Sequence, residues 1–433
     1  MKPNLNHRSN EPNCKGVEIL SIGTELLLGN IVNTNAQWIS EELSALGLNH
    51  FRQSTIGDNS KRISNLIKEI SLRSDLLITT GGLGPTPDDL TTEAIAKSFN
   101  VTLYERESLW DEIKKKLSLS SSIQNNSSLK KQCFFPKDAQ IIHNPRGTAP
   151  GMIWKPKKGF TILTFPGVPS EMKVMWKETA IDYIQKNFSD GYIFFSNTLN
   201  FSGIGESKVS EKIDNLLKLK NPTVAPYANL GELKLRITAR ATNELQAKNL
   251  IKPVKEELKK EFSKFIFGED NETLSSVLIK ELLKRKESLG FAESCTGGLL
   301  SSTITKVSGS SQVFKGSIIS YSNELKQSLL NIPEDRIKKY GAVSEEIAQD
   351  MTINAREKLN SDWSIAISGI AGPSGGSKEK PVGIVYISIA GPNNHITNIK
   401  KIFSSTRNRV EIQRLSVNVC LNSLRLILLS KSK

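Results

Sequence analysis

Apolar runs alternate with stretches of helical periodicity over the first part of the chain. Residues 17–23 (VEILSIG) have the pattern of a buried strand, and apolar positions at helical spacing continue through residues 24–47. A second strand is expected in 51–56 and a second helix in 61–74. A third apolar run at 76–78 then ends in a glycine-rich segment. We expect a βαβαβ unit of a doubly wound sheet, with this segment at the carboxyl end of a strand, where such sheets bind ligands.

The pattern becomes more polar after Met175. A helix is expected in 176–188, a strand, turn and helix in 192–218, an alternating strand in 231–241 and a charged helix in 243–262. These elements predict a small α+β module. It contains no set of residues with an obvious catalytic pattern, and we expect it to link the outer domains or to mediate contacts in a homodimer.

The last third returns to alternating strands and helices. Two apolar strands each end in a glycine-rich loop, in 291–298 (FAESCTGG) and 363–376 (WSIAISGIAGPSGG). A helix capped by Ser344 lies between them, and an amphipathic helix is expected in 410–429. We expect the two loops to converge on one pocket that holds a phosphate and a carbonyl.

Length and composition predict a cytoplasmic protein of two or three domains. The 433 residues exceed what one hydrophobic core usually supports. No apolar run approaches the roughly 20 residues that cross a bilayer, so no membrane is expected. Residues 1–15 are polar and contain proline, which predicts a disordered leader and not a secretory signal.

The net charge of +14 does not by itself indicate nucleic-acid binding. The basic residues beyond Pro381 are spread over a predicted strand, loop and helix, and no basic run is interleaved with aromatic residues, which make up 6% of the chain. We therefore do not expect a nucleic-acid partner, and interpret the charge as favouring solubility or phosphate-bearing small substrates.

The cysteines and histidines are few and scattered. The four of each show no paired spacing, so neither a zinc site nor a disulfide framework is predicted. Cys295 is the one cysteine within a motif, but no histidine lies nearby in sequence to activate a thiol. The shortage of histidine also argues against a Ser–His triad. A serine paired with a lysine whose pKa is lowered by burial needs no histidine.

The glycine-rich segment TTGGLGPTPDD (79–89) is the first candidate site. Its glycines allow backbone N–H groups to approach a phosphate, and threonine hydroxyls add donors. Asp88 and Asp89 would then hold a divalent ion that bridges phosphates. The alternative is a tight turn in which Asp89 caps a helix that begins at Leu90.

The order of this segment resembles the molybdopterin-binding fold of the MoaB/MogA family, in the version that begins the CinA (competence/damage-inducible) proteins. GTELLLGNIVNTNA, GTAPGM and FPGVPSEM are similar to that version too. The resemblance implies a metal-dependent pyrophosphatase acting on ADP-ribose-like nucleotides. It places the nucleotide against Glu25, Thr80, Gly81, Gly82, Gly84, Asp88 and Asp89. Pro166, Pro169 and Glu171 either line the same pocket or form a structural turn.

The last third resembles the nicotinamide-nucleotide amidase domain of CinA proteins. The similarity is carried by AESCTGG, GSS, YSNELK, GAVSE, SGIAGPSGG and KPVG, in that order. It implies hydrolysis of nicotinamide mononucleotide (NMN) to nicotinic acid mononucleotide and ammonia without a cofactor, by a Ser–Lys pair with a nearby tyrosine. Lys326 and Tyr321 fall on the YSNELK motif. Ser311 of the GSS loop is the preferred nucleophile, with Ser294 and Ser310 as alternatives.

The remaining expected contacts follow from the same motifs. Thr296 and the N–H groups of Gly297 and Gly298 would hold a phosphate or an oxyanion, and Arg407 would pair with the substrate phosphate or a carboxylate. The full set of expected substrate-binding residues is Glu293, Ser294, Thr296, Gly297, Gly298, Ser368, Gly369 and Arg407. Without the motif, Lys326 and Arg407 would be surface residues and Tyr321 a core residue.

The expected organisation is therefore a leader (1–15), a MoaB/MogA-like nucleotide-binding domain (16–180), a small α+β linking domain (181–268) and an α/β amidase domain (269–433). Two other functions stay open. One is a molybdopterin-binding protein with an accessory C-terminal domain. The other is a non-enzymatic accessory protein in competence or DNA damage, which no residue pattern supports.

Overall fold

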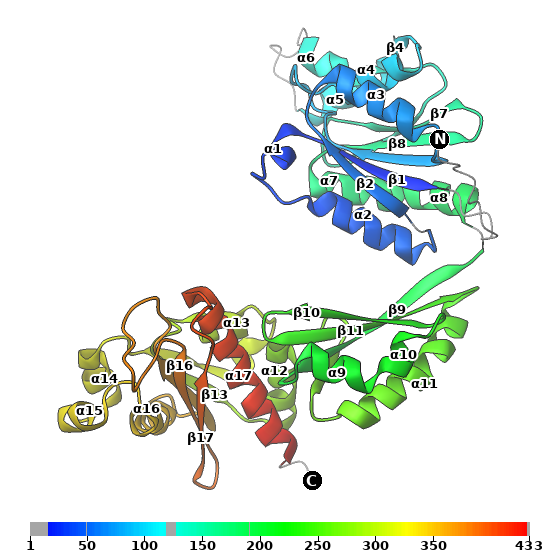
Figure 1. Cartoon of the computed structure of the whole chain (residues 1–433). Helices are drawn as coiled ribbons and strands as arrows, with labels where there is room; N and C mark the ends of the chain where they lie inside the picture. Colours follow the sequence, from blue (N-terminus) through cyan, green and yellow to red (C-terminus); the bar gives the residue numbers. More distant parts are fainter. Residues whose placement is uncertain (1–15, 49, 118–126, 190, 431–433) are drawn as a thin grey trace, which may run out of the picture. The chain divides into compact units, whose positions relative to one another are not determined.

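The computed structural model describes residues 16–48, 50–117, 127–189 and 191–430 (Figure 1), so the expected leader lies outside the described residues. The chain divides into two compact units. The first comprises Met1–Phe195 and Arg240–Ala247, and the second comprises Ser196–Ala239 and Lys248–Lys433.

A six-stranded sheet forms the centre of the first unit, in the order β2-β1-β3-β8-β7-β6. β2, β1, β3 and β8 are parallel, and β7 pairs antiparallel with both β8 and β6. The strands are β1 (Val17–Ile22), β2 (His50–Ile56), β3 (Leu76–Thr80), β6 (Gln140–Ile142), β7 (Gly151–Lys157) and β8 (Phe160–Phe165).

Helices cover both faces of this sheet (Figure 1). Successive residues of a strand point to opposite faces, so Ile19 packs under one helical layer and Leu20 under the other. One layer contains α2 (Thr34–Ala45), α7 (Pro169–Met175) and α8 (Ile181–Phe188), and the other contains α3 (Ser60–Ile70), α4 (Thr91–Ser98) and α5 (Glu107–Lys116). This arrangement confirms the doubly wound fold. The core includes Ile184 and Phe188 and so extends beyond residue 180.

The smaller elements of the first unit surround the sheet. They are α1 (Thr24–Leu27), β4 (Leu103–Glu105), α6 (Ser127–Lys130), η2 (Lys131–Cys133), β5 (Phe134–Pro136) and η3 (Trp176–Ala180). The single helix predicted over 24–47 is wrong, because α1 and α2 are separate. Gly29 adopts φ +72° after α1, and the Asn33 side chain accepts a hydrogen bond from the Ala36 N–H to begin α2.

The middle module is a four-stranded sheet in the order β10-β11-β9-β12, covered by helices. Its elements are β9 (Ile193–Ser202), α9 (Glu206–Lys212), α10 (Asp214–Leu217), β10 (Thr223–Asn229), β11 (Glu232–Ala241), α11 (Glu244–Phe262) and β12 (Ile266–Glu269). Burial alternates along β11, as the sequence predicts.

The C-terminal domain is built on a five-stranded sheet in the order β14-β13-β15-β16-β17. β14, β13 and β15 are parallel, and β16 pairs antiparallel with both β15 and β17. The strands are β13 (Leu289–Glu293), β14 (Phe314–Ile319), β15 (Trp363–Gly369), β16 (Ile384–Gly391) and β17 (His395–Ile402).

Two helical layers cover this second sheet. One contains α12 (Leu274–Arg285), α13 (Leu299–Thr305) and α17 (Arg409–Ser430), and the other contains α14 (Asn323–Leu330), α15 (Glu334–Tyr340) and α16 (Glu345–Lys358). The short η4 (Ser310–Gln312) precedes β14. Among the described helices, α17 has the length and apolarity of a membrane span, but half of its apolar stretch is buried in the domain core. We interpret α17 as a core helix.

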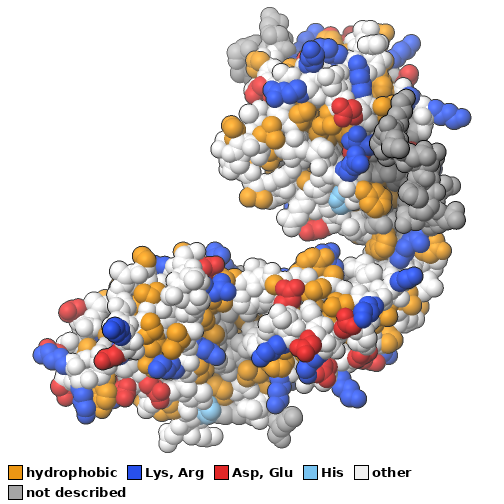
Figure 2. Space-filling view, viewed as in Figure 1, with side chains coloured by type: hydrophobic (Ala, Val, Ile, Leu, Met, Phe, Trp, Pro, Cys, Tyr) orange, Lys and Arg blue, Asp and Glu red, His pale blue; other side chains and the backbone are white. Residues whose placement is uncertain are grey.

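Charged side chains of both signs are intermingled on the molecular face shown in Figure 2. On that face no broad basic stripe gathers over one element, although the net charge is +14.

Candidate active site

The ESCTGG loop begins where β13 ends, at the carboxyl edge of the C-terminal sheet. β13 lies between β14 and β15 and is parallel to both, so the residues that follow all three strands meet at this edge. The Ser294 N–H donates to the Ile367 carbonyl of β15, and the Gln413 side chain of α17 donates to the Cys295 carbonyl. The loop is therefore fixed from two sides.

The Glu293 carboxylate organises the loop from within. Its side chain is fully buried and accepts hydrogen bonds from the Thr296 hydroxyl, the N–H groups of Gly298 and Leu300, and both the N–H and hydroxyl of Ser301. The last two residues lie in the first turn of α13, where a carboxylate is favourable. Glu293 was expected to bind substrate, but its geometry is that of an internal cap.

Lys326 and Ser294 form the central pair of the site. The Lys326 side chain is 1% exposed, and its Nζ lies 3.2 Å from Ser294 Oγ and 2.8 Å from the Ser320 carbonyl oxygen. A further contact of 3.4 Å reaches the Tyr321 carbonyl. Lys326 is thus a buried residue and not a surface lysine, and it contacts a serine hydroxyl.

Burial lowers the pKa of Lys326 below its ordinary value, because the charged ammonium loses its hydration. Cys295 and Glu324 oppose this shift at longer range. Within the described part of the chain, no carboxylate forms an ion pair with Lys326. A lysine whose pKa is lowered in this way is neutral more of the time than an exposed lysine at the same pH, and the neutral amine can take a proton from a hydroxyl.

Ser311, the preferred nucleophile from the sequence, lies at the opposite edge of the sheet. It belongs to η4, which precedes β14, whereas Ser320 and Tyr321 follow β14. The six residues of β14 separate the two edges by about 20 Å at roughly 3.3 Å per residue. The parallel pairing of Glu293 with Ile319 places Ser294, not Ser311, beside Lys326. The assignment of the nucleophile therefore moves to Ser294. Ser310, in the same 3₁₀ turn, is equally remote.

Tyr321 and an arginine that the sequence interpretation missed form the rim of the site. The Tyr321 side chain is 56% exposed, which excludes a core role, and its hydroxyl accepts a 2.6 Å hydrogen bond from Arg409. Arg409 also donates to the Gly372 carbonyl in the second glycine-rich loop. Arg407 instead forms an ion pair with Glu411 at 3.6 Å. The sequence signal for Arg409 was its position at the start of the last helix.

The other expected binding groups are engaged within the protein. The Gly297 N–H donates to the Ser294 carbonyl and the Gly298 N–H to Glu293, so neither is available to an oxyanion. Ser368 is buried and donates to the Ala342 carbonyl. A Cβ at Gly369 would lie 2.7 Å from the Ile384 carbonyl oxygen. Thr296 donates to Glu293. The structure therefore gives these residues a supporting role in the site.

A separate cavity of about 530 Å³ lies at the carboxyl edge of the sheet in the first unit. It is lined by every residue expected there: Glu25, Thr80, Gly81, Gly82, Gly84, Asp88 and Asp89, together with Pro166, Pro169 and Glu171. The sequence prediction did not include Asn35, whose Nδ2 donates to the Thr80 hydroxyl and the Gly167 carbonyl. Its buried Oδ1 has no hydrogen-bond partner among the described residues.

Two glycines of this cavity are sterically required. Gly81 and Gly82 have φ values of +101° and +65°. A Cβ at Gly81 would lie 2.0 Å from the Ile22 carbonyl oxygen, and one at Gly82 would lie 2.3 Å from Thr91 Oγ1. The turn after β3 therefore exposes its backbone to the cavity only with glycine at both positions.

Asp88 and Asp89 close the turn after β3. Both accept a hydrogen bond from the Thr86 hydroxyl, and Asp89 also accepts from the Thr86 N–H. The hydrogen bond from Thr86 holds the pKa of Asp88 below its ordinary value. Asp89 is not the N-cap of α4, since Leu90 occupies that position. In the described ranges no group of three or more His, Cys, Asp or Glu side chains gathers.

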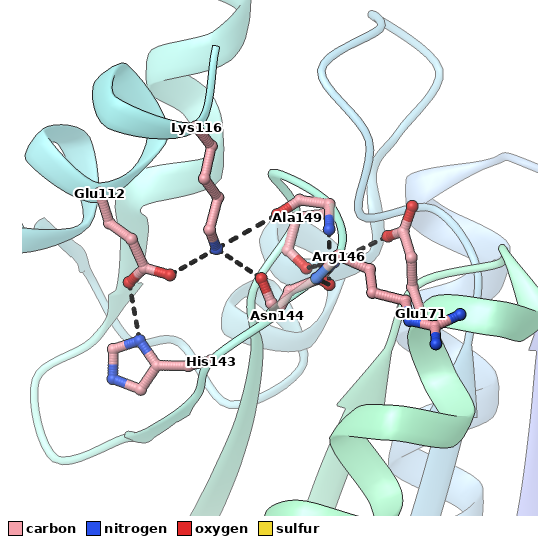
Figure 3. A network of polar contacts seen from close by, with 8 residues as sticks. Glu112, Lys116, His143, Asn144, Arg146, Ala149 and Glu171 are labelled. Carbon is pink, nitrogen blue, oxygen red and sulfur yellow. Dashed lines mark hydrogen bonds and ion pairs between the residues drawn. The ribbon is translucent and has the colours of Figure 1, made fainter. Parts of the chain in front are cut away.

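The wall of the cavity at Glu171 is supported by a polar network around Asn144 (Figure 3). The Asn144 Nδ2 donates to Glu171 and to the Ala149 carbonyl, while its Oδ1 accepts from the N–H groups of Arg146 and Gly147. Lys116 donates to the Asn144 carbonyl and to Glu112, which also contacts His143. This network fixes the loop that carries Ala149.

Three family descriptions cover the chain in sequence. Residues 18–186 match a probable molybdopterin binding domain, residues 196–268 match the KH domain of damage-inducible protein CinA, and residues 271–428 match the CinA C-terminal domain. The fold and the site therefore define a three-domain protein of the CinA type.

The chain belongs to the family of CinA-like proteins. It is 84% identical over its full length to the CinA-like protein of Prochlorococcus marinus subsp. pastoris (strain CCMP1986 / NIES-2087 / MED4), with full coverage of both chains. It is 51% identical to that of strain MIT 9313, over 96% of this chain and 97% of the relative. Among solved structures, CinA from Thermoplasma acidophilum is 34% identical over 40% of this chain and 99% of its own, with a TM-score of 0.37.

Proposed function

We propose that the C-terminal domain hydrolyses the carboxamide of NMN, giving nicotinic acid mononucleotide and ammonia. The observation that supports this most directly is the contact between Ser294 and Lys326, which is buried and forms no ion pair with a carboxylate of the described residues. A serine hydroxyl becomes a nucleophile only if a neighbouring group accepts its proton. Lys326 is that group, because burial lowers its pKa.

In the proposed reaction, Ser294 Oγ attacks the carboxamide carbon while the neutral amine of Lys326 takes the hydroxyl proton. The C–N bond of the tetrahedral intermediate then breaks, and the Lys326 ammonium returns the proton to the departing nitrogen, which leaves as ammonia. Water attacks the resulting ester with Lys326 again as the base, and the acid product and free Ser294 are released.

The oxyanion of the intermediate requires donors other than those expected from the sequence. Within the described residues, no oxygen atom accepts a hydrogen bond from the N–H groups of Cys295 and Thr296, and both residues directly follow the nucleophile in the same turn. We assign them to the oxyanion, since unengaged backbone N–H groups held in a fixed turn stabilise developing negative charge. The buried Cys295 thiol is not a competing nucleophile, since burial raises its pKa to about 12.

NMN is favoured over a neutral amide because a cation lies at the rim. Arg409 is held by Tyr321 and Gly372, and its guanidinium suits a phosphate monoester. The family resemblance supports the same substrate. The test is ammonia release from NMN by the purified full-length chain, compared with free nicotinamide. No release from NMN would exclude the proposal, and equal release from nicotinamide would exclude the phosphate contact.

We propose further that the cavity of the first unit binds ADP-ribose and supports hydrolysis of its pyrophosphate. The glycine turn at Gly81 and Gly82 brings backbone close to the cavity, as a phosphate-binding loop requires. A divalent ion, if the reaction needs one, would be held by Asp88 and Asp89 in this cavity and would offset the negative charge of the pyrophosphate. The test is release of AMP from ADP-ribose. Tight binding of molybdopterin without binding of ADP-ribose would favour the alternative function.

A further inference from the structure

The cavity at the turn after β3 contains a carboxylate whose position is fixed by a buried amide. Glu171 lies in the first turn of α7 and lines this cavity. Its Oε2 accepts a 2.7 Å hydrogen bond from Nδ2 of Asn144, which is 1% exposed. No donor among the described residues reaches its Oε1. One oxygen of the carboxylate is therefore held by the protein, and the other has no protein partner.

Asn144 is itself held on both sides (Figure 3). Its Oδ1 accepts from the N–H groups of Arg146 and Gly147, and its Nδ2 also donates to the Ala149 carbonyl. The amide cannot turn over without losing these hydrogen bonds, so it presents one N–H to Glu171 in a fixed direction. Gly147 leaves the room that this requires, because a Cβ there would lie 2.4 Å from Glu171 Oε2.

The other carboxylates that line the cavity are placed differently. Asp58 accepts from the N–H and the hydroxyl of Thr24, and the two aspartates of the turn accept from Thr86. The Glu25 side chain is exposed and accepts no hydrogen bond from the described residues. Among these carboxylates, only Glu171 combines a buried side-chain partner with an unengaged oxygen.

The segment that carries Glu171 packs against the glycine turn. β3 and β8 are neighbouring parallel strands, so the segments that follow them share one edge of the sheet. The Gly81 N–H donates to the Phe165 carbonyl, and a Cβ at Gly167 would lie 3.6 Å from the Gly81 Cα. A pyrophosphate at the glycine turn therefore occupies the cavity that Glu171 lines.

We propose that Glu171 is the general base of the pyrophosphatase reaction and that Asn144 is its positioning residue. This inference rests on the function proposed for the first unit. Glu171 Oε1 takes a proton from a water molecule whose oxygen attacks one phosphorus atom of ADP-ribose. The new P–O bond forms as the bridging P–O bond breaks, and the bridging oxygen leaves on the second phosphate. The products are AMP and ribose 5-phosphate, and the proton passes from Glu171 to solvent.

The first test is Glu171→Gln in the full chain, which keeps an acceptor for Asn144 but removes the base. We expect kcat for AMP release from ADP-ribose to fall at least about 100-fold, and the affinity for AMP, measured by calorimetry, to stay within roughly threefold. Glu178→Gln is the matched control, since Glu178 lies in η3 directly after α7 and does not line the cavity. It should leave both quantities unchanged.

The role of Asn144 is tested by a double-mutant cycle. Asn144→Ala should lower kcat about tenfold or more in the wild-type background and less than about twofold in the Glu171→Gln background, because Asn144 acts through Glu171. A loss of equal size in both backgrounds would mean that Asn144 is purely structural. If Asn144→Ala fails to fold, the Glu171 variants still decide the identity of the base.

Rescue distinguishes a base from a metal ligand. Sodium formate should restore part of the activity of Glu171→Ala, since a small carboxylate can take the proton in place of the missing side chain. Recovery with excess MgCl₂ instead would make Glu171 a metal ligand and overturn the inference. Full kcat in Glu171→Gln, or loss of kcat in Glu25→Gln alone, would also overturn it while the pyrophosphatase function stands. Absence of AMP release by the wild type would exclude that function as well.

Discussion

The Nζ of Lys326 lies 3.2 Å from the Oγ of Ser294, and the contact is created by two neighbouring parallel strands. Ser294 follows β13 directly, whereas Lys326 lies in the first turns of α14, after β14. Because parallel strands end at the same edge, the two side chains meet although 32 positions separate them in the chain. The adjacency of the strands is therefore a requirement of the proposed chemistry.

Replacing each of the two candidate serines in turn should show which one is the nucleophile. We expect Ser294→Ala to lower kcat for ammonia release from NMN by at least about 1000-fold, because removal of a covalent nucleophile typically costs that much or more. Ser311→Ala is the matched control and should change kcat less than twofold, since β14 separates it from Lys326. Full activity of Ser294→Ala with an inactive Ser311→Ala would refute the assignment.

The pH dependence of the amidase should report the lowered pKa of Lys326. Only the neutral amine accepts the serine proton, so kcat/KM is expected to rise with pH and to level off below the ordinary lysine value of 10.5. Glu324 raises the pKa of Lys326. Glu324→Gln should therefore shift the rising limb to lower pH. If the rising limb of the pH profile lies at the same pH in this variant, measured at low ionic strength, the role of Lys326 as the base is contradicted.

Removal of the Glu293 charge should destabilise the C-terminal domain. Glu293→Gln replaces an acceptor by an NH₂ group that faces N–H and hydroxyl donors, which we expect to cost roughly 2–4 kcal/mol of unfolding free energy. Urea unfolding with a C-terminal probe measures this change. Glu287→Gln retains an acceptor for the Trp363 indole and should cost less than about 1 kcal/mol. Equal effects of the two substitutions would exclude the capping role of Glu293.

The rim arginine should affect binding of NMN more than the chemical step. Arg409→Gln removes the cation and its hydrogen bond to Tyr321, so KM for NMN should rise about tenfold or more while kcat changes less. Arg407→Gln serves as the control, since Arg407 is paired with Glu411, and it should leave both constants within twofold. If Arg407→Gln raises KM and Arg409→Gln does not, Arg407 is the residue that contacts the substrate, as the sequence predicted.

Gly81 should tolerate no side chain. Gly81→Ala places a Cβ against the Ile22 backbone, so we expect loss of ADP-ribose binding and destabilisation of the first unit by more than about 2 kcal/mol. Gly29 also has a positive φ, but a Cβ at this position would meet open space. Gly29→Ala should therefore lower the unfolding free energy by only about 1 kcal/mol. Ammonia release should be unchanged in both variants, because Ser294 and Lys326 belong to the other unit.

The fold was largely predictable because apolar runs of strand length and glycine-rich turns are local signals. The site was predictable as a set of motifs but not as a set of contacts. Lys326 was identified from its motif, yet its serine partner was misassigned, since only strand order shows which residues share an edge. Arg409 was missed because the proximity of α17 to Tyr321 depends on packing. Glu293 was predicted to contact the substrate. Its carboxylate instead accepts hydrogen bonds from the first turn of α13, and the sequence pattern did not show where that helix begins.

The enclosed Glu293 carboxylate also determines when the ESCTGG loop becomes ordered. All the donors around it belong to the same chain and are engaged before any substrate arrives. The entropy lost in fixing this loop is therefore part of the folding free energy and does not reduce the affinity for the substrate. Ser294 lies at the start of a loop whose shape is set by an internal anion, so we expect the proposed attack by its hydroxyl to need no rearrangement of that loop.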